Sequence, residues 1–301
     1  MIASRVPMTV NDLEVSQFIA GFWRQNSWEY SDGELQAYIE SLLELGVTTI
    51  DHAFVYRSES QFGRVLKQAP RLREGMEIIS KFGIRPMGFG DMGAQNTNHY
   101  DSSPEYMRRS VEATLSDLRT DYLDVLLVHR PDYLMDTDAL AAAFIKLKEQ
   151  GKVRHFGVSN FTTYQFECLQ AACDFPLVTN QIEFSPLCMG PLENGVLDQC
   201  QLYHVNPMLW SCLGGGRLMT GTDEQSVRIR DALGKVADSV GARSLDQVIY
   251  AWVLSLPCKP LPIIGSSRID RVKSAIEAEN LQLDREQWYS VWEASTGYSV
   301  P

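Results

Sequence analysis

The sequence lacks the residue patterns of several common classes of protein. Its six cysteines all lie in the second half of the chain, and no two of them form a Cys-x-x-Cys pair. The five histidines form no His-x-x-x-His pair. These absences argue against a disulfide framework or a zinc motif, and they favour reduced thiols. We therefore expect a protein that binds no metal.

Long apolar runs and an excess of positive charge are also missing. The start of the chain, Met1 to Pro7, has no apolar signal core, and no apolar run is long enough to cross a bilayer. We expect a cytoplasmic protein without a membrane partner.

The chain has 27 Lys and Arg residues and 38 Asp and Glu residues, so its net charge is −11. Such a surface repels phosphate backbones and argues against a nucleic-acid partner, but it permits a local basic pocket for one small anion.

Short apolar runs alternate with amphipathic stretches along the 301 residues. Most of the runs are continuous, which is typical of parallel strands buried on both faces. Their spacing suits a βα repeat, which needs roughly 30 residues. The eight predicted strands are Gln17–Trp23, Thr48–His52, Met76–Lys81, Tyr122–His129, Val153–Ser159, Leu177–Glu183, Asn206–Leu213 and Leu261–Ser266.

Capping signals predict where helices begin between these strands. A capping box at Ser31–Glu34 opens a stretch that Gly46 ends. Ser103-Pro104 is an N-cap followed by proline at the first helical position. Further capping boxes stand at Ser244–Gln247 and Asp284–Gln287.

Eight βα units in one chain predict an α/β fold, the (β/α)8 TIM barrel. An N-terminal segment leads into the first strand, and an extra helix follows the eighth unit. Two intervals are long: a loop, Gly83–Ser102, follows strand three, and an insertion with a helix around Glu224–Val240 follows strand seven. No linker-like composition divides the chain, so we expect one barrel domain over residues 1–301. The alternative is a doubly wound open sheet, but its first-turn glycine fingerprint is missing.

The carboxyl ends of the predicted strands are where such a barrel carries its chemistry. Asp51, Lys81 and His129 end the second, third and fourth strands, and Tyr56 follows on the loop after the second. Tyrosine ionises near pH 10, which is too high for an efficient acid at neutral pH. A lysine ammonium nearby would lower the pKa of Tyr56, and an aspartate would keep that lysine charged. With His129 orienting a substrate oxygen, the four residues describe a general acid aimed at a carbonyl.

This quartet and the local motifs around it resemble the aldo-keto reductases from about Ile19 to the C-terminus. The segments Ser211–Arg217 and Gly297–Pro301 look most like the bacterial YdhF-type branch of that family. The motifs that carry the resemblance are Thr49-Ile-Asp51-His-Ala-Phe-Val-Tyr56, Ile79-Ser-Lys81, Leu127-Val-His129-Arg-Pro-Asp132, Gly157-Val-Ser-Asn160, Asn180-Gln-Ile-Glu-Phe-Ser-Pro186 and Pro262-Ile-Ile-Gly-Ser266.

The resemblance implies an NADPH-dependent reductase of a small aldehyde or ketone. The nicotinamide would give a hydride to the carbonyl carbon while Tyr56 protonates the oxygen. Lys81 and Asp51 would tune Tyr56, and His129 would position the carbonyl. Trp23 and Phe54 flank the predicted barrel mouth and are expected as walls of the substrate pocket.

The resemblance also implies a set of cofactor-binding residues. The nicotinamide carboxamide would contact Ser159, Asn160 and Gln181, and Trp210 would stack on the ring. The pyrophosphate would follow Ser211, Leu213 and Gly214. Ser266, Arg268 and Arg271 stand where strand eight meets the next helix. A helix N-terminus with two arginines suits a 2′-phosphate, which is the reason to prefer NADP over NAD.

Two other functions remain open from the sequence. Lys81 could form a Schiff base in a lyase of the same barrel shape, although Asp51 would hold its amine protonated. The barrel could also bind the nucleotide as a regulatory or sensory protein with little turnover. The physiological carbonyl and the oligomeric state do not follow from the sequence.

Overall fold

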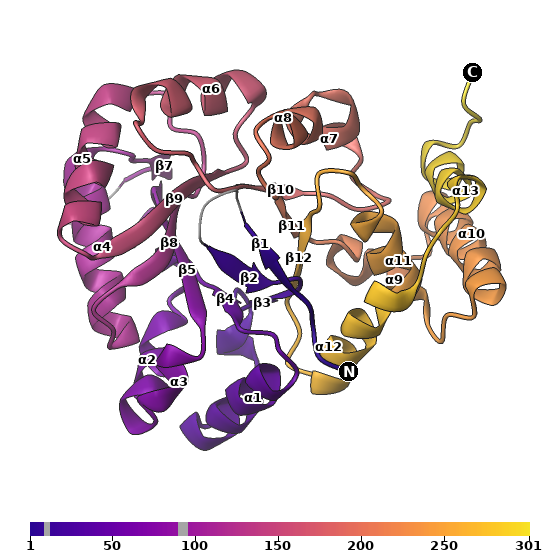
Figure 1. The fold of residues 1–301 in the computed structure, drawn as a ribbon, viewed down its shortest axis with the longest axis horizontal. Helices are drawn as coiled ribbons and strands as arrows, with labels where there is room; N and C mark the ends of the chain where they lie inside the picture. Colours follow the sequence, from indigo (N-terminus) through magenta and orange to yellow (C-terminus); the bar gives the residue numbers. More distant parts are fainter. Residues whose placement is uncertain (9–12, 90–95) are drawn as a thin grey trace.

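The computed structural model describes residues 1–8, 13–89 and 96–301, and a closed barrel of parallel strands forms its centre (Figure 1). Within these residues the barrel closes in the order β10-β11-β12-β3-β4-β5-β8-β9. The predicted barrel is confirmed, and the open-sheet alternative is wrong because β12 pairs with β3. The barrel strands are β3 (Ile19–Gly21), β4 (Thr49–Asp51), β5 (Glu77–Phe82), β8 (Leu123–Val128), β9 (Val153–Ser159), β10 (Asn180–Glu183), β11 (Met208–Trp210) and β12 (Leu261–Ile264).

The inside of the barrel has its own small apolar core. Side chains alternate between the two faces of a strand, so residues two apart on one strand share a face. Ile79, Leu127 and Met208 belong to one buried cluster. Met8, directly after β1 (Arg5–Pro7), and Val15 of β2 (Glu14–Ser16) join this cluster from a two-stranded hairpin that β1 and β2 form. Figure 1 shows this hairpin within the ring of strands, so the predicted N-terminal lead-in covers one end of the barrel.

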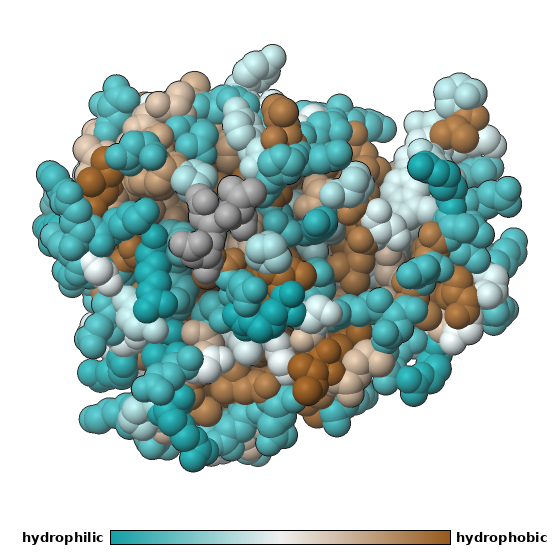
Figure 2. Space-filling model, viewed as in Figure 1, coloured by the Kyte–Doolittle hydropathy of each residue, from teal (hydrophilic) through white to brown (hydrophobic). Residues whose placement is uncertain are grey.

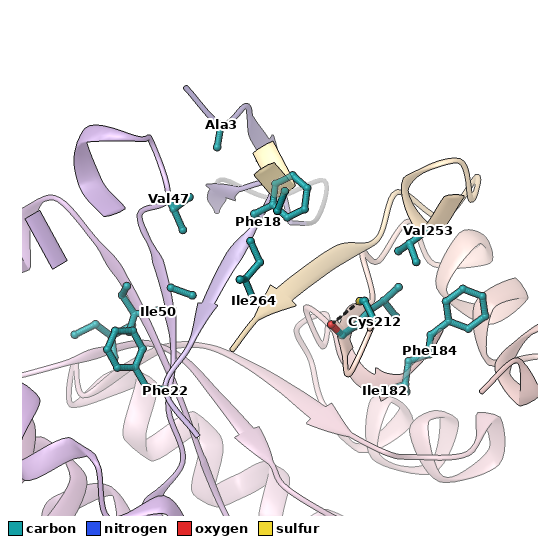
Figure 3. Close-up of a cluster of buried hydrophobic side chains, with 14 of the residues drawn as sticks. Ala3, Phe18, Phe22, Val47, Ile50, Ile182, Phe184, Cys212, Val253 and Ile264 are labelled. Atoms are coloured by element: carbon teal, nitrogen blue, oxygen red, sulfur yellow. Dashed lines mark hydrogen bonds between the residues drawn. The ribbon is translucent and has the colours of Figure 1, made fainter. Parts of the chain in front are cut away.

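A larger core lies between the strands and the surrounding helices. Ile50, Ile182 and Ile264 come from three different strands and belong to this outer cluster (Figure 3). Phe184 of the same cluster stacks on Trp252, with ring centroids 5.4 Å apart. The helices outside the barrel include α1 (Asp32–Glu44), α2 (Glu59–Gln68), α3 (Arg71–Glu74), α4 (Pro104–Leu118), α5 (Thr137–Glu149), α6 (Thr163–Ala172), α7 (Gly190–Glu193), α8 (Val196–Leu202), α11 (Leu245–Leu254) and α12 (Ile269–Glu277).

Three of the four predicted helix starts have the expected caps. Ser31 and Asp284 form complete capping boxes, and Ser103 caps α4 ahead of the proline. The predicted box at Ser244 is wrong, because its side chain caps no backbone N–H of α11. Its hydroxyl lies 3.1 Å from the hydroxyl of Ser274 on α12. The Ser244 hydroxyl therefore contacts a side chain of another helix instead of a backbone N–H of its own helix.

The insertion and the final helix pack together on the outside of the barrel. The insertion after β11 contains α9 (Arg217–Thr220) and α10 (Glu224–Val240), and the last helix is α13 (Arg285–Thr296). In Figure 1, α10 and α13 lie side by side beyond the ring. Trp252 and Trp288 stack at 4.9 Å and exchange indole-to-carbonyl hydrogen bonds of 3.0 Å, which ties α13 to α11. The predicted insertion and extra helix are therefore confirmed.

The predicted loop after the third strand contains a short antiparallel pair. Strand β6 (Ile84–Arg85) pairs with β7 (His99–Tyr100), and residues 90–95 of the loop lie outside the described residues.

No helix in the described ranges is long and apolar enough to cross a membrane. On the face that Figure 2 shows, hydrophobic residues are interspersed with polar ones.

Candidate active site

The carboxyl ends of neighbouring barrel strands bring polar side chains together. Lys81 stands two residues after the buried Ile79, and His129 stands two residues after the buried Leu127. Because side chains alternate along a strand, each polar residue continues the inward-facing row of its own strand. Asp51 ends β4 beside β5. The inside of the barrel thus changes from apolar to polar toward the ends where the strands finish.

Lys81 is the centre of this polar group. Its Nζ donates to Asp51 Oδ2 at 2.8 Å and to the carbonyl oxygen of His52 at 2.7 Å, and it lies 3.5 Å from Tyr56 Oη. The Lys81 side chain is 0% exposed and that of Asp51 is 5% exposed. Burial alone lowers the pKa of Lys81, but the Asp51 carboxylate and the Tyr56 phenol outweigh it and hold that pKa above its ordinary value. The ammonium is therefore charged throughout the neutral range.

Tyr56 lies on a short 3₁₀ turn, η2 (Phe54–Tyr56), directly after β4. Its ring meets the ring of His129 edge-on, with centroids 5.6 Å apart. Burial is the largest influence on Tyr56 and raises its pKa above the ordinary value, although Lys81 acts in the opposite direction. Lys81 therefore acts on this pKa in the predicted direction, but the net shift is upward, because removing the phenolate from water costs more than the ammonium returns.

Two histidines near this group are neutral. Burial, followed by the charges of Lys81 and Arg130, holds the pKa of His129 well below its ordinary value. The Nδ1 atom of His129 is buried and has no hydrogen-bond partner among the described residues. Burial also lowers the pKa of His52 to about 3. His52 packs against Phe22 and Phe62, away from the open end, so its part in the site is its backbone carbonyl.

The three residues predicted to hold a carboxamide form one connected group. Gln181 donates from Nε2 to Asp51 Oδ1 at 2.9 Å. Ser159 donates to the carbonyl oxygen of Gln181 at 2.9 Å and accepts from Asn160 Nδ2 at 2.8 Å. The backbone of Asn160 has a φ of 60°, a conformation that asparagine tolerates better than most residues. These contacts join the proposed cofactor residues directly to the proposed catalytic ones.

The residues predicted to follow the pyrophosphate lie on a tight turn after β11. Trp210 ends β11 half-buried, and Ser211 has a φ of 56°. The turn η3 (Gly214–Gly216) has a positive φ at each of its glycines. A Cβ on Gly214 would lie 2.6 Å from Leu187 Cδ1, so a larger residue would have to displace that side chain. Leu213 precedes this turn and is half-buried.

The predicted 2′-phosphate residues stand at the start of α12. Arg268 is the N-cap residue of α12, and Ser266 Oγ accepts its backbone N–H at 3.1 Å. Arg271 lies one turn further on and is exposed. The guanidinium of Arg268 is paired with the carboxylate of Asp270. Both arginines thus stand in the first turn of α12, and the guanidinium of Arg268 already has an anionic partner.

The two predicted pocket walls differ in their surroundings. Trp23 is 60% exposed, with the Arg24 guanidinium 4.9 Å from its ring centroid. Phe54 is buried and meets Phe89 edge-on at 5.5 Å. Phe54 therefore packs against the loop after β5, whereas Trp23 is exposed at the surface beside Arg24.

No role follows from the sequence for Arg130 or Glu183, although both stand at strand ends. The guanidinium of Arg130 lies 5.9 Å from the ring centroid of Trp210, and Glu183 is the register partner of Trp210. Their sequence positions could have marked them as site residues: Arg130 directly follows His129, and Glu183 stands two residues after Gln181. Within the described ranges, no cluster of His, Cys, Asp or Glu is arranged to hold a metal ion.

Comparison with known proteins agrees with this geometry. The model of the aldo/keto reductase family matches residues 18–295. The chain is 48% identical to oxidoreductase YdhF of Escherichia coli over the full length of both proteins. It is 38% identical to a 6-dehydroglucose reductase of Agrobacterium fabrum, covering 96% of this chain and 97% of the relative.

A solved structure shares the fold. The glycerol dehydrogenase of Gluconobacter oxydans superposes with a TM-score of 0.84 at 22% identity, covering 99% of this chain and 97% of that one. The family match, the two full-length relatives and the closed barrel agree with one another. This oxidoreductase chain therefore belongs to the aldo/keto reductase family.

Proposed function

We propose that the protein reduces an aldehyde or ketone to an alcohol with NADPH, and that Tyr56 donates the proton. The observation that carries this proposal is the contact of Lys81 Nζ with both Asp51 and Tyr56, at 2.8 and 3.5 Å. A charged ammonium beside a phenol favours the phenolate that forms when the proton leaves. The transfer is therefore assisted at the atom that gives up the proton.

The starting protonation states suit this direction of reaction. The raised pKa of Tyr56 keeps the phenol protonated at neutral pH, so the proton is present when a carbonyl arrives. The lowered pKa of His129 keeps its ring neutral. A neutral imidazole can donate one hydrogen bond to a carbonyl oxygen without adding a charge to the site. Asp51 balances the charge of Lys81 in a buried place.

The residues present fit a dinucleotide. The positive-φ turn at Gly214–Gly216 has open space around Gly215 and Gly216, where an added Cβ would meet nothing within 4 Å. Arg268, the N-cap residue of α12, makes no side-chain cap, so an anion that displaced the Asp270 carboxylate would meet backbone N–H groups at that end. Ser211, Leu213 and Gly214 would hold the pyrophosphate, and Ser266, Arg268 and Arg271 the 2′-phosphate. When bound, the nicotinamide supplies a hydride for the carbonyl carbon.

The nicotinamide end would meet the connected amide group. Ser159, Asn160 and Gln181 offer hydroxyl and amide atoms to a carboxamide, and Trp210 offers a flat face to the ring. Because Gln181 also donates to Asp51, a group held there would lie beside the Lys81 and Tyr56 pair. This hydrogen bond supports assigning the carboxamide-binding residues and the catalytic residues to one site.

The Schiff-base alternative has little support. The Nζ of Lys81 is buried, is hydrogen-bonded to Asp51 and His52, and its pKa is raised. A protonated amine has no lone pair with which to attack a carbonyl. A regulatory barrel that binds nucleotide without turnover differs from a reductase only in its activity. The experiment must therefore measure both nucleotide binding and turnover.

The test is NADPH oxidation by the purified protein over a panel of aldehydes and ketones, together with NADPH binding followed by fluorescence. We expect turnover with at least one carbonyl. Tyr56→Phe should bind NADPH as the wild type does and lose turnover by roughly 10²- to 10⁴-fold. Near-wild-type turnover of Tyr56→Phe would rule out Tyr56 as the acid. Nucleotide binding without oxidation of any substrate would favour the regulatory barrel.

A further inference from the structure

Glu59 is a buried carboxyl outside the group of residues that the proposed reaction uses. It begins α2, and its side chain is fully buried. Ser80 Oγ donates to its Oε1 at 2.6 Å, and Thr114 Oγ1 of α4 donates to its Oε2 at 3.1 Å. Two hydroxyl donors offset only part of the cost of moving a carboxyl out of water. Packing of α2 against α4 alone therefore does not account for a carboxyl at this place.

The contacts of this carboxyl lead to Lys81. Ser80 directly precedes Lys81 on β5 and stands between Ile78 and Phe82, which both belong to the outer core. Because side chains alternate along a strand, Ser80 faces the helices while Lys81 faces the inside of the barrel. Glu59 therefore binds, from outside the barrel, the residue next to the proposed catalytic lysine.

The residue before Glu59 makes a second link, to the other partner of the buried ion pair. Ser58 is the N-cap residue of α2, yet its side chain caps no backbone N–H. Its hydroxyl instead lies 3.1 Å from Nδ1 of His52, the residue that follows Asp51. The backbone carbonyl of His52 also accepts from Lys81. The start of α2 is thus joined to both strands that supply the ion pair.

The same segment carries the proposed acid. Tyr56 precedes Ser58 by two residues and Glu59 by three. Arg57 between them has a φ of 56°, in the left-handed region, where residues other than glycine are strained. Such a backbone persists only where the surrounding contacts hold it. The contacts of Ser58 and Glu59 hold it from the side of α2.

The charge of Glu59 changes within the neutral range. Burial raises its pKa to about 7, against the hydrogen bonds of its two hydroxyl donors. Asp117 of α4 raises the pKa further, and Lys81 of β5 lowers it. When ionised, Glu59 adds a negative charge near Lys81 and weakens the support that the ammonium gives to a phenolate at Tyr56. Proton transfer from Tyr56 should therefore be faster while Glu59 is neutral.

We propose that Glu59 is a positioning residue of the reductase: by binding Ser80 it fixes Lys81 beside Tyr56, and its charge modulates the lysine ammonium. This inference rests on the proposed reductase function and goes beyond it, because it assigns a role to a residue outside the barrel.

The test compares the wild type with Ser80→Ala in the reduction of one carbonyl compound that the wild type turns over. NADPH binding and urea unfolding are measured in parallel. Ser80→Ala removes the link and keeps the carboxyl. It should bind NADPH as the wild type does and lower kcat by roughly 10- to 100-fold, because a misplacement of about 1 Å can cost a factor of about 100.

Ser110→Ala is the matched control for the loss of a buried hydroxyl. Ser110 lies on α4 and is buried, and its hydroxyl donates to the carbonyl oxygen of Tyr106 at 2.9 Å. Ser110→Ala should lose stability and keep its kcat. If Ser80→Ala also loses stability and keeps its kcat, the contact with Glu59 is purely structural and the inference is wrong.

Glu59→Gln tests the charge, and it carries the test if Ser80→Ala does not fold. Glutamine keeps the shape and an acceptor oxygen but does not ionise. The kcat of the wild type should fall by up to about tenfold as pH rises through about 7, since one unit of the Tyr56 pKa corresponds to a factor of about ten. The kcat of Glu59→Gln should not show this fall. A purely structural role would not change the pH profile, so identical profiles would overturn the inference.

Failure of this inference differs from failure of the function on which it rests. Turnover by the wild type, with an unchanged kcat in Ser80→Ala or an unchanged pH profile in Glu59→Gln, would overturn the positioning role and leave the reductase function intact. Absence of NADPH oxidation by the wild type over the whole carbonyl panel would overturn the reductase function itself.

Discussion

Gln181 Nε2 donates a hydrogen bond of 2.9 Å to Asp51 Oδ1, although the two residues are 130 positions apart in the chain. The other oxygen of Asp51 accepts from Lys81. One carboxylate therefore joins the proposed cofactor residues on β9 and β10 to the proposed acid on η2. A change at Asp51 should consequently affect stability, protonation and nucleotide binding together.

Asp51→Asn should be strongly destabilising. Removing one partner of a buried ion pair leaves an uncompensated charge and costs roughly 3–5 kcal/mol. The control is Asp32→Asn, because the Asp32–Arg64 pair is partly exposed and such pairs contribute roughly 0–1 kcal/mol. Urea unfolding measures both losses. Similar small losses for the two variants would contradict a charged, buried Lys81–Asp51 pair.

The same variant should change the alkaline limit of stability. A lysine whose pKa is raised by folding adds stability below its unfolded pKa, and that stability is lost as pH rises through the folded pKa. Asp51→Asn removes an interaction that raises the pKa of Lys81, so the folded and unfolded pKa values lie closer together and the alkaline loss of stability should become smaller. Unfolding free energies measured across the alkaline range test this, and an unchanged profile would contradict it.

Binding of the 2′-phosphate should depend on the residues at the start of α12. Arg271→Ala should weaken NADPH binding by roughly 10- to 100-fold, the range for a hydrogen bond to a charged group. Asp270→Ala should strengthen it, because Arg268 is then free of its carboxylate partner. NADH is the matched control ligand because it lacks this phosphate. Equal changes in the dissociation constants of NADPH and NADH would remove the case for an NADP site here.

Glu59 should make the free energy of unfolding fall as pH rises from about 4.5 to about 7. It is buried between Ser80 and Thr114, which donate to it at 2.6 and 3.1 Å, and burial raises its pKa to about 7. A raised pKa in a carboxyl stabilises the fold at low pH, and that stability is lost between the unfolded pKa and about pH 7.

Glu59→Gln should remove this dependence. Each unit of pKa shift is worth about 1.4 kcal/mol, so the stability of the wild type relative to Glu59→Gln should fall by roughly 3 kcal/mol between pH 4.5 and pH 8. Urea unfolding at several pH values measures the difference. A difference that stays constant with pH would mean that this carboxyl does not titrate differently in the folded protein.

Two glycine substitutions should have opposite effects. A Cβ on Gly63 of α2 would lie 1.8 Å from the carbonyl oxygen of Asp117 on α4, so Gly63→Ala should destabilise the protein severely or prevent folding. Gly234 lies inside α10, where an added Cβ would meet nothing within 4 Å. Gly234→Ala should stabilise the protein by up to about 1 kcal/mol, the helix-propensity difference. Thermal unfolding of both variants checks this, and two equal shifts would contradict it.

Local patterns were sufficient for the order of the elements. The apolar runs marked every barrel strand, because a parallel strand buried on both faces must be apolar along its length. The predicted strand Val153–Ser159 has the observed bounds, and so does the helix Glu224–Val240. The strand predicted as Met76–Lys81 is shifted by one residue, to Glu77–Phe82. The remaining strands are shorter than predicted, because hydrogen bonding between neighbours ends before the apolar sequence does.

The sequence was sufficient to predict the site residues that stand at the ends of strands. Asp51, Lys81 and His129 each follow an apolar run, so their meeting at one end of the barrel follows from parallel strands alone. The pair of Arg268 and Asp270 is close in sequence but is not apparent from composition, because either side chain could have pointed elsewhere.

The sequence by itself determined the barrel, the place of its chemistry and the residues that meet there, because these depend on period-two alternation and on local caps. Only the tertiary structure decided how those residues behave. Burial reverses the expected direction of the Tyr56 pKa, and a neighbour on α12 takes the hydroxyl of Ser244 from its predicted cap. Desolvation and competition for hydrogen bonds depend on which distant segments pack together, and no local pattern records that.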